Sequence, residues 1–189
     1  YFNDWIEEIK THNYLHNHTR MWFASTWIFT LGLPWQLGAK FFFEHLYDGD
    51  AASNLLSWRW VAGLQTKGKK YIFSPQNLKK FSNNRFSVQK IINQDIVLED
   101  NFEMVYSKQI YQSDMKKSSD FLIIFENDLH VDSLRNLISR YKYVFTVFLE
   151  NNDRIIKLSS AVINFKINLL KEFSNKFSNI KMVSSTELI

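Results

Sequence analysis

The two halves of this 189-residue sequence differ so much in composition that one uniform fold does not account for both. All six Trp and all five Gly lie before residue 69, whereas the second half is rich in Ile, Asn, Lys and Phe. The chain has no Cys, which excludes disulfide frameworks, thiol nucleophiles and Cys-ligated metals and favours a reducing, cytoplasmic setting. We therefore expect a first unit over residues 1–86, a linker over 87–118 and a second unit over 119–189.

Helix signals dominate the first unit. Gly32 is a stop signal for a helix that is apolar nearly all round, and such a helix is expected at the centre of its domain. Pro34 can open the next helix, and Asp50 fits the N-cap of the one after it. The apolar run over 21–33 contains Ser and Thr and is too short to span a bilayer, so we expect no membrane association. The predicted helices cover residues 4–11, 16–31, 34–47 and 51–64.

The second unit alternates between strand and helix signals. Two short apolar runs of strand length are separated by one segment with helical spacing, and a second helix and a third strand follow. Parallel neighbours in a sheet need such crossover helices, so this order predicts a small parallel sheet. The predicted strands are 121–125, 143–149 and 181–184, and the predicted helices are 131–141 and 160–177.

Two clusters of polar residues could suggest a metal site. Among His12, His16 and His18, only the first pair has the spacing that brings two side chains together on one helix, and no HExxH motif is present. We read these histidines as polar groups at helix ends and expect no metal there. Asp48 and Asp50 fit an acid pair or magnesium site and equally fit a turn followed by a cap. The residues alone leave that choice open.

Three short motifs carry a resemblance to a known family. Residues 16–21 read HNHTRM, residues 48–54 read DGDAASN and residues 58–60 read WRW. In this order and spacing they resemble the C-terminal part of the FAD-binding helical domain of the photolyase and cryptochrome family, over Tyr14 to about Arg85. The residues within the motifs are most similar to those of a bacterial photolyase-like branch. The resemblance implies a mainly α first unit that binds FAD.

What the resemblance implies for function is light-driven electron transfer from FAD to pyrimidine dimers in DNA, a carbon–carbon lyase activity. A cryptochrome-like blue-light photoreceptor and a cofactor-free fragment are the alternatives. In the family, other helices complete the flavin pocket, so the isolated chain is expected to be inactive. We also expect it to self-associate through the uncovered face of the pocket. That face would carry Arg20, Trp35, Asn54 and Trp58.

The resemblance also assigns residues to the cofactor. Asn54 corresponds to the residue beside flavin N5, where an amide can donate or accept a hydrogen bond. Arg20 and Asp48 correspond to a buried ion pair against the isoalloxazine ring, which tunes the flavin potential. Asp50 corresponds to the acid that hydrogen-bonds the flavin, and Asn17 to the amide at the adenine side.

Aromatic residues take the electron-transfer and substrate roles. Trp58 and Trp35 correspond to the inner two tryptophans of the chain that photoreduces the flavin. Trp60 corresponds to an aromatic residue on which a flipped dimer would stack, and Met21 to a lesion-facing residue. Tyr14 stands where many members have Trp. Core packing is the alternative reading of any one of these aromatic residues.

A basic stretch over residues 59–90 suggests contact with DNA. No acidic residue lies between Asp50 and Asp95, while eight basic residues do. Beside a cavity for a flipped base, such a stretch fits a track for the DNA backbone, and a solvated surface is the alternative. The basic residues assigned to DNA are Lys67, Lys69 and Lys70.

Overall fold

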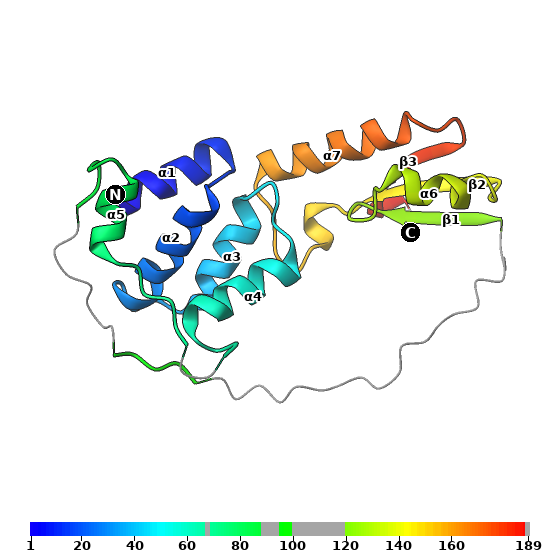
Figure 1. The fold of residues 1–189 in the computed structure, drawn as a ribbon. Helices are drawn as coiled ribbons and strands as arrows, with labels where there is room; N and C mark the ends of the chain where they lie inside the picture. Colours follow the sequence, from blue (N-terminus) through cyan, green and yellow to red (C-terminus); the bar gives the residue numbers. More distant parts are fainter. Residues whose placement is uncertain (67–68, 88–94, 100–119, 188–189) are drawn as a thin grey trace. The chain divides into compact units, whose positions relative to one another are not determined.

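Contacts divide the chain into two units, Tyr1–Phe102 and Glu103–Ile189 (Figure 1). In the described residues the first unit is helical, and the second holds a parallel sheet with helices. The predicted fold class, a mainly α unit followed by a small α/β unit, is therefore confirmed. The domain limits set from the sequence stay a prediction. The computed structural model describes residues 1–66, 69–87, 95–99 and 120–187.

Five helices form the described part of the first unit. Four of them match predicted helices, but the last one was not predicted from the sequence. Its start carries a recognisable signal, because the Ser74 hydroxyl accepts a hydrogen bond from the Asn77 backbone N–H at 3.3 Å and Pro75 occupies the first helical position. The helices are α1 (Phe2–His12), α2 (Asn17–Phe29), α3 (Trp35–His45), α4 (Ala51–Ala62) and α5 (Pro75–Phe81).

The ends of α2 and α4 follow the sequence signals. Asp50 caps α4, its Oδ1 accepting from the Ser53 N–H at 2.7 Å. Gly63 ends the same helix with φ of 79°, and a Cβ there would lie only 3.0 Å from the Lys70 Cβ, so the position needs glycine for two reasons. Gly32, with φ of 65°, follows α2 as predicted.

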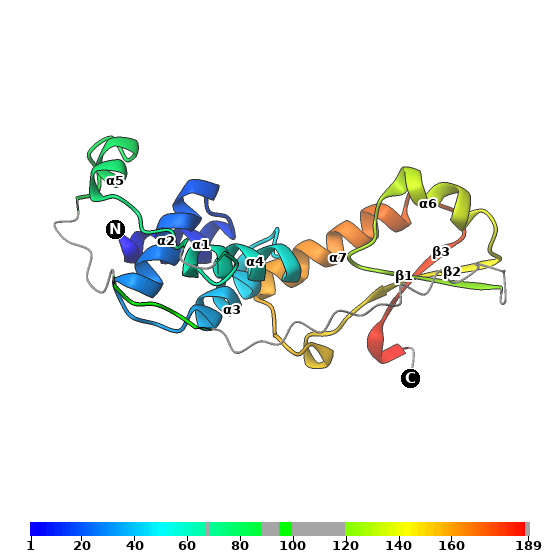
Figure 2. The ribbon, with the colours of Figure 1, turned by 60° about the horizontal axis from the view of Figure 1, so that its bottom comes forward.

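α2 is the central helix of the first unit, as its apolar sequence predicted. It contacts α1, α3 and α4, and the ribbon views show it among them (Figures 1 and 2). The side chains of Phe23 and Phe29 are fully buried. Its buried Ser25 hydroxyl accepts a hydrogen bond from the Phe73 N–H at 3.1 Å, which ties the segment before α5 to the core. None of the described helices is long and apolar enough to cross a membrane.

The second unit contains the predicted parallel sheet. Its strands lie in the order β1-β2-β3, with Phe121 opposite Tyr143 and Val144 opposite Ile180. Helices connect consecutive strands, as parallel pairing requires. The elements are β1 (Phe121–Phe125), α6 (Val131–Ile138), β2 (Tyr143–Phe148), a 3₁₀ turn (Asn151–Asp153), α7 (Ser160–Ser174), β3 (Ile180–Ser184) and a second 3₁₀ turn (Ser185–Glu187).

The helices α6 and α7 lie on one side of the sheet (Figure 2). The Thr146 and Ser174 hydroxyls share a buried hydrogen bond of 2.9 Å between β2 and α7. The core on this side is formed by Ile124, Leu134, Ile138, Val144 and Phe173. The opposite face exposes a row of apolar side chains, namely Phe121, Ile123, Phe125 and Tyr143.

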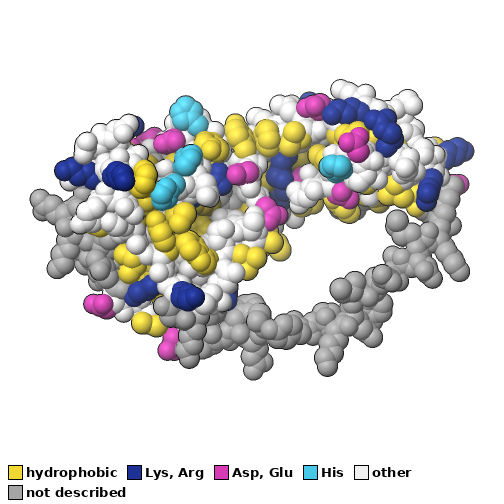
Figure 3. All heavy atoms as spheres, in the orientation of Figure 1, with side chains coloured by type: hydrophobic (Ala, Val, Ile, Leu, Met, Phe, Trp, Pro, Cys, Tyr) yellow, Lys and Arg dark blue, Asp and Glu magenta, His cyan; other side chains and the backbone are white. Residues whose placement is uncertain are grey.

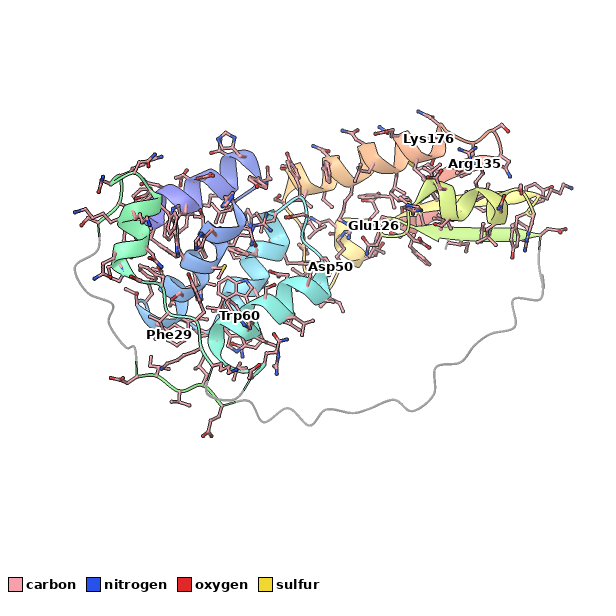
Figure 4. The ribbon with its side chains drawn as sticks, in the orientation of Figure 1. Phe29, Asp50, Trp60, Glu126, Arg135 and Lys176 are labelled. Atoms are coloured by element: carbon pink, nitrogen blue, oxygen red, sulfur yellow. The ribbon has the colours of Figure 1, made fainter. Side chains whose placement is uncertain are left out.

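A buried ion network closes the end of the sheet where β1 and β2 finish. The Arg154 guanidinium donates to both Glu126 carboxylate oxygens, at 2.8 and 2.6 Å, and the Lys166 ammonium lies 3.2 Å from the same carboxylate (Figure 4). Burial alone would raise the pKa of Glu126. The hydrogen bonds from Arg154 and the charge of Lys166 outweigh it and hold the pKa below its ordinary value.

Glu126→Gln is expected to destabilise the α/β unit by about 3 kcal/mol, because it leaves Arg154 and Lys166 without their carboxylate. Since the folded pKa of Glu126 lies below the unfolded one, its stabilisation is present at neutral pH and is lost as the pH falls through the folded pKa. The α/β unit has no Trp, so amide hydrogen exchange in β2 measures its stability while indole fluorescence reports on the helical unit.

The matched control is Glu172→Gln, because the Glu172 side chain is 70% exposed and pairs with Lys176 at 3.5 Å. A pair of that kind contributes little to stability. Equal hydrogen exchange in Glu126→Gln, Glu172→Gln and the parent would contradict the role given to the buried network.

Candidate functional site

A cavity of about 430 Å³ lies in the helical unit between the start of α2, the end of α3 and one side of α4. Its volume is typical of sites for small-molecule ligands. The residues assigned from the three motifs meet there although they come from separate segments. The predicted site residues that line the cavity are Asn17, Arg20, Met21, Asp48, Asn54, Trp58 and Trp60.

Arg20 and Asp48 form the expected ion pair at the cavity. Two guanidinium nitrogens each lie 3.0 Å from a carboxylate oxygen, and the Arg20 Nε donates to the Leu15 carbonyl at 2.7 Å. The pair is not buried, because the Asp48 side chain is 60% exposed in the turn that follows α3. The expectation of a buried pair is therefore wrong for the described chain, and the guanidinium faces both the cavity and solvent.

Asn13 positions the segment that carries Asp48. Its backbone adopts the left-handed conformation, with φ of 53°, just after α1. The Asn13 side-chain amide donates to the His45 carbonyl at 2.8 Å, and its backbone carbonyl accepts from the Tyr47 N–H at 3.0 Å. Asn13 is not among the residues predicted from the sequence. An Asn directly after a predicted helix is the signal that could have identified it.

Asn54 is fixed in orientation by the neighbouring helix. Its Nδ2 donates to the Ala39 carbonyl at 2.7 Å, and only the NH₂ end of the amide can make that bond. Asn54 lines the cavity in this fixed orientation. Asn17 is exposed at the first position of α2, and Met21 is half-buried one turn later.

Trp58 forms one wall of the cavity and is itself only 2% exposed. Its ring packs edge-on against Phe23, Trp27 and Phe42 at centroid distances of 6.3, 6.3 and 5.1 Å. A Cβ on Gly38 would lie 2.2 Å from this ring, so only glycine in α3 allows α4 to pack this closely. The buried Trp58 Nε1 has no hydrogen-bond partner among the described residues.

Apart from the basic residues assigned to DNA, three predicted site residues lie outside the cavity lining. Asp50 caps α4 (Figure 4), and the backbone hydrogen bond that it accepts there lowers the pKa of its carboxyl group. Trp35 is 9% exposed, with the Arg59 guanidinium 6.0 Å from its ring centroid. Tyr14 is 53% exposed and lies under the Arg20 guanidinium at 5.6 Å.

The apolar surface of the helical unit differs from the expected one. Trp35 and Trp58 were expected on an uncovered face, but both are buried by neighbouring helices. Apolar side chains nevertheless gather on the visible face of this unit (Figure 3). The large apolar residues that are more than one third exposed on α3 and α4 are Leu37, Leu55, Leu56 and Trp60.

Trp60 is 41% exposed at the edge of the cavity (Figure 4). It stacks on Tyr71 with the ring centroids 5.5 Å apart and the planes 25° apart. Partial burial raises the pKa of the Tyr71 phenol. Trp60 thus lines the cavity while it stacks on Tyr71.

The basic residues assigned to DNA differ in their surroundings. Lys69 is exposed, as a backbone contact requires. Lys70 donates to the Ile96 carbonyl at 3.1 Å and its ammonium lies 5.5 Å from the Phe29 ring centroid, so it contributes to the fold. Lys67 lies outside the described residues.

Comparison with known proteins gives the class of this unit. Residues 5–94 match the model of the FAD binding domain of DNA photolyase. A deoxyribodipyrimidine photo-lyase of Streptomyces griseus is 41% identical over 61 residues, which are 32% of this chain and 13% of that protein. The enzyme of Buchnera aphidicola is 34% identical over 90 residues, 46% of this chain and 19% of the relative. That of Escherichia coli is 33% identical over 72 residues, 37% of this chain and 15% of the relative.

The match covers just under half of the chain, and it relates the helical unit to the FAD binding domain of DNA photolyase. The matched segments span less than one fifth of the length of each of these relatives. No solved structure gives a significant match.

Gly38→Ala is expected to displace the Trp58 ring and to lower the stability of the helical unit by about 1–3 kcal/mol, the usual result of overpacking a core. Urea unfolding followed by indole fluorescence measures the loss. The atoms that would clash belong to the outer ring of the indole, which Phe lacks. Gly38→Ala combined with Trp58→Phe should therefore cost less than the sum of the single variants. Strict additivity would contradict the close contact.

Proposed function

We propose that the helical unit forms part of the FAD site of a light-driven photolyase-like protein that acts on pyrimidine dimers in DNA. The observation that carries the proposal is the cavity, which brings together the side chains of three motifs far apart in the sequence. The family match and the names of the relatives support the same reading.

The residues present fit a flavin in the chemistry they offer. A flat ring with several acceptor and donor atoms needs a cation, an oriented amide and aromatic walls. Arg20 supplies the cation, Asn54 the oriented amide and Trp58 the wall, and all three line the cavity. Asn17, exposed at the start of α2, is the proposed contact to the adenine side.

FAD, when bound, supplies light-driven one-electron chemistry. The residues of the chain hold the flavin and tune its potential. Arg20 donates to both carboxylate oxygens of Asp48, so its guanidinium keeps a fixed position beside the ring. Asn54 cannot rotate without losing its bond to Ala39, so its polar atoms stay in place during a change of flavin protonation. Asp50 contributes to the site indirectly, by fixing the start of α4. One of its carboxylate oxygens accepts the capping hydrogen bond from the Ser53 N–H.

Trp58 is the proposed electron donor to the flavin. It lines the cavity, is almost fully excluded from water and contacts three further aromatic rings. An oxidisable ring that lines the cavity and is shielded from water is what an electron donor to a flavin bound there requires.

The Trp60–Tyr71 stack is the proposed platform for the lesion. Stacking on an aromatic face tolerates any base, and a damaged pair costs less to open than a normal one. Met21 lines the same cavity, and Tyr14 lies beyond Arg20 at its edge. Lys69 is the proposed contact to the DNA backbone.

The alternatives differ in what they require. A cryptochrome-like photoreceptor would bind FAD without repair, and the three relatives, each named a photo-lyase, favour repair. A cofactor-free chain would leave the cavity without a ligand, and the exposed Leu56 and Trp60 at its edge would then favour self-association. A reducing, cytoplasmic setting remains part of the proposal because the chain has no Cys.

The test is light-dependent repair of an oligonucleotide that contains one thymine dimer, using a protein that carries this unit together with the helices that complete the flavin pocket, supplied with FAD. The dimer should disappear under blue light and persist in the dark. Flavin binding with no repair would favour the photoreceptor alternative. Absence of flavin binding would contradict the proposal as a whole.

Trp60→Ala should weaken binding of the dimer-containing oligonucleotide about tenfold, the effect of losing one base–aromatic stack. Flavin content should not change, because Trp60 stacks on Tyr71 at the edge of the cavity. Phe125→Ala, which removes a 60% exposed aromatic residue from the α/β unit, is the matched control. Equal loss of affinity in the two variants would remove Trp60 from the lesion site.

A further inference from the structure

One face of the sheet in the α/β unit carries no helix in the described part of the chain. The helices α6 and α7 lie on the other side (Figure 2), although sheets of parallel strands are usually covered on both faces. We propose that this open face binds the same face of a second copy of the chain, in a twofold dimer whose two sheets pack antiparallel. The juxtaposition that carries it is an exposed aromatic sheet face with lysines toward its amino end and acidic turns at its carboxyl end.

The open face consists of the outward side chains of β1 and of the first half of β2. Phe121 pairs in register with Tyr143 and Ile123 with Phe145, and paired residues of neighbouring strands point to the same face. The Phe121 ring centroid lies 5.3 Å from that of Tyr143 and 6.2 Å from that of Phe145. Phe125 continues the exposed row at the end of β1. A contiguous exposed apolar surface of this kind marks an interaction site.

Lysines lie toward the amino end of the open face. Lys142 directly precedes β2, and its ammonium lies 5.0 Å from the Tyr143 ring centroid. Lys181 is the second residue of β3 and pairs in register with Phe145, which places it on the open face. Both lysines are exposed. The three strands contain no acidic residue, so the charge that they contribute to this face is positive.

Two acidic turns close the carboxyl end of the same face. The 3₁₀ turns that follow β2 and β3 lie on the side of the sheet away from α6 (Figure 2). The Ser185 hydroxyl donates to the Asp153 carboxylate at 2.5 Å and joins the two turns. Val147 and Val183 belong to the open face by register but are buried at this end. Asp153 and Glu187 are exposed on the turns and make this end acidic.

The turns and the charges favour one way of packing two copies. Stacked sheets keep their strand directions within about 30° of each other, which leaves a parallel and an antiparallel arrangement. In the parallel arrangement the turns of both copies would meet at one end, and the lysines of both copies at the other. In the antiparallel arrangement the turns of each copy lie beside the amino end of its partner.

The antiparallel arrangement also pairs opposite charges strand by strand. Lys142 precedes β2 and Asp153 follows it, so packing β2 on the β2 of the second copy brings these two charges together. Lys181 and Glu187 are related in the same way through β3. Each pair occurs twice in a twofold dimer, because such an interface joins the same surface of both copies. The apolar rings between the charged ends supply the core of the interface.

A nucleic acid fits this face less well than a second copy does. Exposed rings beside lysines are suited to stacked bases and phosphates. The carboxylates of Asp153 and Glu187 at the other end would repel a phosphate backbone that crosses the face. A second copy meets both signs of charge, since each end of the face finds the opposite end of its partner.

The first test is analytical ultracentrifugation of the full chain over a range of concentrations. The parent should form dimers, and Ile123→Glu should raise the dimer dissociation constant at least about tenfold, because it places a carboxylate within the apolar core. Leu56→Glu is the matched control, since Leu56 is 50% exposed on the helical unit and Ile123 is 48% exposed. This control should leave the dissociation constant unchanged. Circular dichroism of each variant verifies that the chain is folded.

The second test uses only exposed charges and so leaves the sheet intact. Lys142→Glu and Asp153→Lys should each weaken the dimer about tenfold, because each change places two like-charged pairs in the interface. An equimolar mixture of the two variants should restore dimers, since each substituted end then faces an opposite charge. The flavin plays no part in either measurement, so both tests are independent of the proposed function.

A monomeric parent would overturn the inference. So would a dimer that Leu56→Glu weakens and Ile123→Glu does not, because association would then occur through the helical unit. Failure of the mixed variants to dimerise would contradict the antiparallel arrangement. A monomeric parent that binds a single-stranded oligonucleotide, with binding lost in Ile123→Glu and Lys142→Glu, would assign the open face to nucleic acid instead.

Discussion

The contact between Gly38 and Trp58 is the constraint on which the functional unit depends. With no Cβ at residue 38, the indole occupies the space where a side chain would lie 2.2 Å away, and α3 and α4 approach more closely than any other residue allows. A glycine in the middle of a helix lowers helix stability by about 0.5–1 kcal/mol. The close packing that it permits buries Trp58, sets one wall of the cavity and brings the same ring against Trp27.

The polar part of the site depends on a different arrangement, in which backbone groups position side chains. Asn13 fixes the segment after α3 and thereby Asp48, Ala39 orients Asn54, and Leu15 together with Asp48 holds Arg20. Arg20, Asp48 and Asn54 are thus each oriented by hydrogen bonds, which is the preorganisation that binding sites require. The α/β unit has a comparable feature of its own in the buried network around Glu126.

Much of the fold was predictable because its signals are local. Asp50 and Gly63 bound α4 through capping chemistry, and two apolar runs separated by one helix are enough to predict the parallel pair β1 and β2. Seven of the side chains assigned from the resemblance line the cavity, whereas Trp35, Asp50 and Tyr14 do not. The sequence could not show that the Arg20–Asp48 pair is exposed, that Gly38 faces Trp58 or that Trp27 contacts it. These contacts and exposures depend on how separate helices pack against one another. The hydrophobic periodicity of a single helix does not predict them. Ser74 and Pro75 form a helix-start signal at α5 that the predicted helices do not include.

The central claim is that the cavity between α2, α3 and α4 holds the flavin, and NMR of the isotope-labelled chain during addition of FAD tests it most directly. The account predicts that the largest shifts fall on the side-chain amides of Asn17 and Asn54, the Arg20 guanidinium and the Gly49 amide, and that β2 amides do not move. The indole N–H of Trp58 should shift with them, since it belongs to the cavity wall. Shifts confined to other surfaces, or no shift at any residue of the cavity, would contradict the account.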